Sequence, residues 1–209
     1  MKYIAPLFVF FALILTAGSG AQAALSQADN QHIARAQAYL QDLQTVKANF
    51  TQINADKEVL KGTFYLWRPG RMRFSYNPPR KDLVVADGLW IHFYDAATRE
   101  ITDATIGQTL ADFILRKKIS LDNKDLSVKR VRQVDGEIQI TVVQASDPGL
   151  GSLTLVFKAN PYYLLGWRVV DAQGLVTTIR LENLEKDLKL PASLFVFKPP
   201  AGARRSNNQ

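Results

Sequence analysis

Residues 59–76 read VLKGTFYLWRPGRMRFSY, two runs of strand-forming residues on either side of Pro69-Gly70. Because adjacent proline and glycine mark a turn, this pattern predicts strands near Val59–Arg68 and Arg71–Tyr76. Alternate side chains of a strand share a face. By that parity, one face of the predicted hairpin carries Phe64, Leu66 and Arg68, and then Met72, Phe74 and Tyr76 after the turn.

Arg68 is the one polar side chain predicted among the large apolar ones on that face. A guanidinium beside an apolar surface is costly unless its five N–H donors find acceptors. Two interpretations stay open from the pattern: carbonyl or carboxylate groups of a covering helix accept these bonds, or the side chain reaches solvent past Pro69. We expect Arg71, Arg73 and Arg80 to form a solvated basic edge.

The two-residue period continues over most of the chain. Asp87-Gly88 and Asp135-Gly136 are favoured two-residue hairpin turns, so neighbouring strands should be antiparallel and consecutive. The other predicted strands are Val46–Ile53, Asp82–Ala86, Leu89–Asp95, Glu100–Thr102, Leu126–Val134, Glu137–Gln144, Ser152–Lys158, Leu164–Asp171, Leu175–Glu182 and Leu194–Phe197. The fold class is therefore mainly β, with about a dozen strands in one curved sheet.

Two helices are predicted beside this sheet. An amphipathic helix near Ser26–Thr45 starts with a capping pattern and has an apolar stripe at helical spacing. A shorter helix within Gly107–Lys118 places Leu110, Phe113 and Ile114 on one side. Two such helices cannot fill the concave side of so large a sheet, so we expect a cavity.

Residues 63–67 and 89–94 carry large apolar side chains on both faces of their predicted strands. Both faces should therefore be at least partly covered. Either helices cover one face and a loop covers the other, or one face is lined by bound lipid.

The N-terminus has the features of a secretory signal peptide. Lys2 precedes the apolar run Ile4–Ala17, and Ala21-Gln22-Ala23 is a cleavage site of the expected kind. The apolar run is shorter than the roughly 20 residues that span a bilayer. We therefore expect residues 1–23 to be cleaved and residues 24–209 to form one soluble, exported domain.

Composition excludes several function classes. The chain has no cysteine, so it has no disulfide, no thiol for lipid attachment and no thiolate metal site. Its two histidines lack metal-ligand spacing, and no nucleophile motif is present, so we expect neither an enzyme nor a cofactor.

Without Lys2 the chain carries 25 basic and 19 acidic side chains, a net charge of +6. An anionic membrane surface, an acidic partner protein or solubility alone would explain this charge, whereas export argues against nucleic acid.

Five segments together resemble the LolA family of outer-membrane lipoprotein carrier proteins. They are Phe50–Gln52, Gly62–Tyr76, Val85–Gly88, Phe93–Asp95 and Phe195–Gly202. The resemblance follows nearly the whole exported chain in order and is weakest over Leu121–Val134.

The resemblance implies an unclosed antiparallel half-barrel of about 11 strands, with a lid of short helices over a hydrophobic cavity. It implies a periplasmic, non-enzymatic carrier that accepts acylated lipoproteins from an inner-membrane ABC transporter and passes them to an outer-membrane receptor. We expect the carrier to be a monomer. A regulatory protein of the same fold, which binds lipid or a misfolded partner to signal, is the alternative.

The resemblance also assigns site residues. It makes Arg68 a lid latch that hydrogen-bonds to the lid in the closed form, and it leaves the packing of the second lid helix open, because relatives often have a proline and aromatic residues there. It places Leu40, Leu43 and Val46 on the first lid helix, and Phe113 and Ile114 on the second. The expected cavity and lid residues are completed by Phe64, Leu66, Met72, Phe74, Tyr76 and Leu110.

Overall fold

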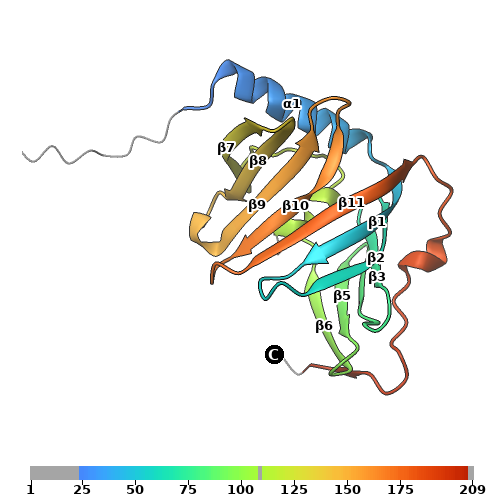
Figure 1. Cartoon of the computed structure of the whole chain (residues 1–209). Coiled ribbons are helices and arrows are strands. Elements are labelled where there is room, and N and C mark those ends of the chain that lie inside the picture. The colour runs from blue at the N-terminus through green and yellow to red at the C-terminus, as the bar shows by residue number, and fades with distance from the viewer. Residues whose placement is uncertain (1–23, 108–109, 207–209) are drawn as a thin grey trace, which may run out of the picture.

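The computed structural model describes residues 24–107 and 110–206, with the side chains of residues 110–112 left out. The predicted signal peptide, residues 1–23, lies outside the described residues. Within the described part, twelve strands form one sheet (Figure 1). The strands are β1 (Thr45–Ile53), β2 (Val59–Trp67), β3 (Arg71–Tyr76), β4 (Leu83–Asp87), β5 (Trp90–Asp95), β6 (Glu100–Thr105), β7 (Leu126–Val134), β8 (Glu137–Gln144), β9 (Gly151–Lys158), β10 (Tyr163–Asp171), β11 (Val176–Lys186) and β12 (Arg204–Arg205).

The strand order is β12-β6-β5-β4-β3-β2-β1-β11-β10-β9-β8-β7. Consecutive strands pair antiparallel within β1–β6 and within β7–β11, and the β1–β11 pair joins the two halves. The edge strands β7 and β12 do not pair with each other, so the sheet curves without closing. The prediction of an open, mainly antiparallel half-barrel is confirmed.

Helix α1 (Gln27–Asp42) is shorter than the predicted Ser26–Thr45. Ser26 is the N-cap, and its side chain and that of Asp29 form the reciprocal bonds of a capping box. At the other end, Thr45 pairs with Trp67 as the first residue of β1. The predicted helix is too long because strand pairing wins over helical periodicity from residue 45 onward.

The second predicted helix, within Gly107–Lys118, is the short 3₁₀ segment η1 (Leu110–Leu115). Another 3₁₀ turn, η2 (Pro148–Leu150), connects β8 to β9. None of the described helices is long and apolar enough to cross a membrane.

The predicted strand Leu194–Phe197 is wrong. The chain forms the 3₁₀ turn η3 (Ala192–Phe195) and then runs without regular structure to β12, which pairs parallel with β6. Pro191, Pro199 and Pro200 flank this segment, and a proline cannot donate a ladder hydrogen bond. We call residues 192–206 the C-terminal strap, and Figure 1 shows it running down the side of the half that contains β2–β6.

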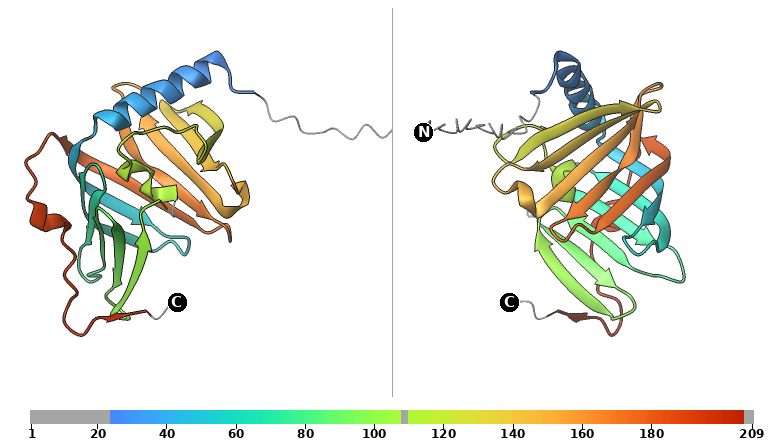
Figure 2. Two further views of the ribbon diagram at one scale, coloured as in Figure 1. Left: turned by 180° about the vertical axis from the view of Figure 1, so that it is seen from behind. Right: turned by 60° about the vertical axis from the view of Figure 1, so that its left-hand side comes forward.

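Figure 2 shows α1 crossing one end of the half that contains β7–β10, and η1 lying on the concave side of the sheet. Side chains of α1, of η1 and of the concave face form one buried apolar cluster. The functional question is therefore whether this cluster is a permanent core or a covered binding surface.

Candidate functional site

The apolar face predicted for the first hairpin exists as a wall of the concave side. Phe64 pairs across the strands with Phe74, and Leu66 pairs with Met72. The rings of Phe64 and Phe74 have centroids 4.7 Å apart. All four side chains are buried, which places these predicted residues together on one wall.

The predicted lid residues pack onto that wall. Leu40 on α1 and Phe113 and Ile114 on η1 are at most 3% exposed and belong to the same cluster. Leu43 and Val46 are also buried, but the assignment of both to the lid helix is wrong: Leu43 is the C-cap of α1, and Val46 lies on β1 opposite Leu66. The side chain of Leu110 lies outside the described residues.

Beyond the lid, the concave face contains an open apolar hollow of about 240 Å³. The predicted residues Met72, Phe74 and Tyr76 line one side of it. Phe93 is 38% exposed at this hollow, so a large apolar side chain faces an unfilled space. The lining residues that sequence reasoning missed are Gln52, Val84, Ile91, Phe93, Trp167, Val169, Thr177 and Ile179.

The size of the hollow matters. Pockets for drug-sized ligands typically measure about 300–1,000 Å³, so 240 Å³ is too little for a large ligand. The space beside it is filled by the side chains of α1 and η1. A larger ligand would enter only if these two elements moved away.

Arg68 contacts the ends of both covering elements. Its side chain is 4% exposed, so the alternative in which it reaches solvent is wrong. Nη1 donates to the Leu40 carbonyl oxygen at 2.7 Å and, over longer distances, to those of Gln41 and Leu43. Nη2 donates to the Arg116 carbonyl oxygen at 2.6 Å and to that of Lys117 at 3.2 Å.

These acceptors are the carbonyl groups that helix ends leave without intrahelical partners. Those of Leu40, Gln41 and Leu43 also lie at the negative end of the α1 dipole, which favours a nearby cation. Burial lowers the pKa of Arg68 from its ordinary value. Within the described residues, the hydrogen-bond partners of the Arg68 side chain are all backbone carbonyl oxygens. If the lid opens, water can replace these bonds, and no carboxylate is left buried without a partner.

Two glutamines of α1 attach it to the segment after η1. The Gln41 side chain accepts from the Ile119 N–H at 2.9 Å and donates to the Lys117 carbonyl oxygen. The Gln37 side chain accepts from the Leu121 N–H at 2.8 Å. Sequence reasoning did not pair these glutamines with any segment, because their partners are about 80 residues away. We use "lid" for α1 together with residues 110–121.

Few polar bonds join the lid to the sheet. Besides Arg68, the Gly70 N–H donates to the Leu115 carbonyl oxygen at 2.9 Å, and Lys186 of β11 donates to the Asp42 carboxylate of α1 at 2.8 Å. Much of the lid–sheet contact is apolar packing, with polar contacts at the Pro69-Gly70 turn and at Lys186.

The outer face of β2–β5 is covered by the C-terminal strap. The Trp67 and Phe195 rings meet edge to face, and Arg73 donates to the Leu194 carbonyl oxygen at 3.0 Å. The expectation of a solvated basic edge is therefore wrong for Arg73. For the apolar residues on both faces of these strands, a loop covers the outer face.

A polar cluster holds the strap at its far end. His92 stacks on Phe197 with centroids 4.6 Å apart. His92 Nδ1 lies 2.6 Å from Asp103 Oδ1, and Nε2 lies 3.2 Å from Asp87 Oδ2. Arg205 of the strap forms an ion pair with the same Asp103. Within the described residues, no group of three or more His, Asp or Glu side chains could hold a metal ion.

Comparisons with known proteins agree on one family. The model of "Outer membrane lipoprotein carrier protein LolA" matches residues 41–198. An outer-membrane lipoprotein carrier protein of Methylococcus capsulatus is 29% identical, over 85% of this chain and 88% of the relative. One from Methylibium petroleiphilum is 32% identical, over 79% and 84%.

Among solved structures, an uncharacterized conserved protein from Thermus thermophilus matches with a TM-score of 0.50 and 13% identity. The match covers 85% of this chain and 99% of that one. At this identity the likeness concerns the fold alone.

Proposed function

Since the chain belongs to the LolA family of outer-membrane lipoprotein carrier proteins, we propose that it carries acylated lipoproteins through the periplasm from the inner to the outer membrane. The observation that carries the proposal is the apolar hollow, beside which the concave face is covered by a lid with few polar bonds to the sheet. Such a surface suits acyl chains, which need apolar area and no specific polar partner.

The energetics favour exchange of the lid for a lipid. Each buried methylene contributes about 0.8 kcal/mol. A hydrogen bond from a charged donor contributes about 1.5–3 kcal/mol net. Burial of eight methylenes would thus offset the two short bonds of Arg68, and further methylenes would replace the apolar lid–sheet contacts, so acyl chains can displace the lid without ATP. In this mechanism Arg68 is the latch of the closed form.

The direction of transfer follows from the same balance. In an empty carrier the lid packs on the apolar wall. Because only the open form binds lipid, this closure lowers the apparent affinity of the carrier for lipid. A loaded carrier gives up its cargo to an acceptor that offers a better apolar surface. We propose an inner-membrane ABC transporter as the donor and an outer-membrane receptor as the acceptor, with the carrier acting as a monomer and without catalysis.

Adjacent residues on β10 provide a matched test. Val169 lines the hollow, whereas Val170 pairs with Val176 on the opposite face. A carboxylate in an apolar pocket is strongly unfavourable. Val169→Asp should therefore weaken binding of a synthetic triacylated lipopeptide at least tenfold in native mass spectrometry, and Val170→Asp should leave it unchanged.

The peptide without acyl chains is the ligand control. Equal binding of the acylated and unacylated peptides, or equal loss in both variants, would contradict the carrier proposal. Copurification of a signalling protein instead of lipoproteins would favour the regulatory alternative.

A further inference from the structure

The outer face of β7–β11 gathers arginines in two neighbouring rows. Strand pairing places Arg130 of β7 and Arg168 of β10 in one row, with threonines between and beyond them. The next row contains Arg132 of β7 and Arg180 of β11, with Gly166 beside Arg180. The two rows run Arg130–Thr141–Thr154–Arg168–Thr178 and Arg132–Gln139–Val156–Gly166–Arg180.

Most of these cations are unpaired. Arg130, Arg132 and Arg168 are exposed, and in the described part of the chain their side chains make no hydrogen bond, ion pair or ring contact. Arg180 is paired: its Nη2 lies 3.5 Å from Oε1 of Glu137, the first residue of β8. By contrast, Arg80 has two carboxylate partners. Part of the excess positive charge of the chain is thus concentrated and free on one face.

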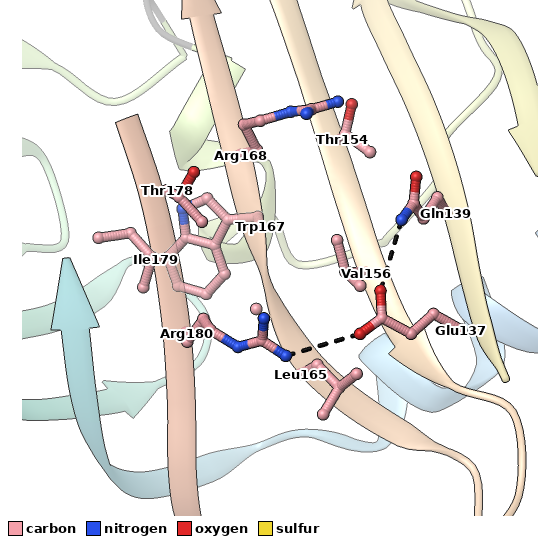
Figure 3. A pocket seen from close by; sticks show the side chains of 11 residues that line it. Glu137, Gln139, Thr154, Val156, Leu165, Trp167, Arg168, Thr178, Ile179 and Arg180 are labelled. Carbon is pink, nitrogen blue, oxygen red and sulfur yellow. Dashed lines mark hydrogen bonds and ion pairs between the residues drawn. The ribbon is translucent and has the colours of Figure 1, made fainter. Parts of the chain in front are cut away.

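A hollow of about 200 Å³ with both polar and apolar lining lies between the two rows (Figure 3). It forms where Gly166 contributes no side chain; a Cβ there would be 2.0 Å from the Ile179 carbonyl oxygen. Arg168, Arg180 and Thr178 line it, together with the carboxylate of Glu137, which pairs with Arg180, and with Thr154, whose hydroxyl group bonds to that of Thr141. Guanidinium groups beside hydroxyl donors are the partners that phosphate oxygens prefer.

The same face ends in exposed apolar residues. Leu150 at the β8–β9 turn and Leu175 at the β10–β11 turn are 54% and 57% exposed. They flank Asp171, which pairs with Gly151 and bonds to the backbone of Leu175. Asp147 and Asp171 are the acids of these turns, and both accept backbone N–H bonds there.

We propose that this outer face docks on anionic phospholipid headgroups at a membrane surface. Free arginines attract the negative surface, the hollow receives a headgroup phosphate, and the two leucines enter the interface. A protein partner would recognise acidic side chains through the same arginines, but it would not require protruding leucines beside them. The membrane is therefore the occupant that matches both features.

The position of this face adds a functional consequence. Val169 and Thr177 of the same β10–β11 hairpin line the apolar hollow of the concave side. Docking through Leu175 would bring that rim close to the bilayer. The inference goes beyond the carrier proposal, because binding to lipid surfaces is measured without any cargo.

The test is sedimentation of the exported chain, residues 24–209, with vesicles of 70% phosphatidylcholine and 30% phosphatidylglycerol, and with pure phosphatidylcholine. We expect binding to the anionic vesicles alone, and weaker binding as salt rises. The triple variant Arg130→Gln, Arg132→Gln and Arg168→Gln should bind roughly a hundredfold more weakly.

The charge-matched control replaces three exposed lysines in loops elsewhere, Lys57, Lys81 and Lys189, by glutamine. It should weaken binding less than about threefold. The double variant Leu150→Ser and Leu175→Ser should weaken binding about tenfold at unchanged charge.

Equal losses in the two triple variants would overturn the proposal, because they would show attraction by net charge only. Absence of binding to anionic vesicles would overturn it as well, even if an acidic protein were captured. Binding of inorganic phosphate by a protein that does not bind anionic vesicles would identify a free-anion site and contradict membrane docking. Lipopeptide binding by the arginine variant should stay at the wild-type level, which separates this test from that of the carrier function.

Discussion

Replacement of Arg68 by leucine should shift the lid toward its open form. The side chain makes two short bonds, 2.7 Å to the Leu40 carbonyl oxygen and 2.6 Å to that of Arg116. At about 1.5–3 kcal/mol for each charged bond, the closed state loses about 3–6 kcal/mol. Burial of the new leucine returns about 1.5–3 kcal/mol. The difference between the central values is a net shift of about 2 kcal/mol, which corresponds to roughly 10- to 100-fold in the lid equilibrium.

The assay is amide hydrogen exchange, because one backbone bond reports directly on the lid. The Gly70 N–H donates to the Leu115 carbonyl oxygen and is freed when the lid leaves the sheet. Its exchange should accelerate by the same 10- to 100-fold factor in Arg68→Leu, and the affinity for a triacylated lipopeptide should rise in proportion.

Arg80→Leu is the matched control, since it removes an arginine that pairs with Glu58 and Asp82 instead of the lid. Arg68→Lys should lie between wild type and Arg68→Leu, because one ammonium group cannot span both helix ends as a planar guanidinium does. A folded Arg68→Leu protein with wild-type exchange at Gly70 would refute the latch.

Three further predictions concern stability and pH. Gly166→Ala should lower the free energy of unfolding by more than about 2 kcal/mol in a denaturant titration, because the new Cβ would meet the Ile179 carbonyl oxygen and alanine is strained at a φ of 146°. Gly174→Ala is the control: its φ is 81°, but the space around it is open, so the free energy of unfolding should fall less. Burial alone would raise the pKa of Asp87, but hydrogen bonds from two backbone N–H groups and an imidazole hold it below its ordinary value. The stabilisation from Asp87 is therefore present above about pH 4 and is lost as the pH falls through the folded-state pKa. Asp87→Asn should reduce stability at pH 7 and flatten this acid dependence; an unchanged unfolding curve from pH 7 to pH 3 would contradict the assignment. Ser26→Ala should cost about 1 kcal/mol of α1 stability and speed amide exchange in its first turn, and unchanged exchange there would show that the capping box is dispensable.

Strand positions were predictable because alternation and turn residues are local signals. The predicted bounds of β3, β7 and β8 agree with the structure. The wall formed by Phe64, Leu66, Met72 and Phe74 followed from strand parity alone. These features depend only on neighbours in sequence, and hence no knowledge of the tertiary arrangement was needed.

The rest depends on contacts between distant segments. The hollow is completed by Trp167 and Val169 because β11 pairs with β1, a join that no turn signal predicts. The C-terminal strap resembles a strand in composition, but it lies across the sheet and is held by Arg73 and His92. The glutamines that attach α1 to residues 117–121 were visible in sequence as polar residues without an assigned partner.

The most direct measurement of the central claim is photo-crosslinking with a lipopeptide that carries a diazirine at the end of one acyl chain, followed by peptide mapping. The carrier account predicts labels on β3 and β10, at residues such as Phe74, Trp167 and Val169. Labels confined to the outer face, or labels no stronger than those from an unacylated diazirine peptide, would contradict the claim that the concave face receives acyl chains.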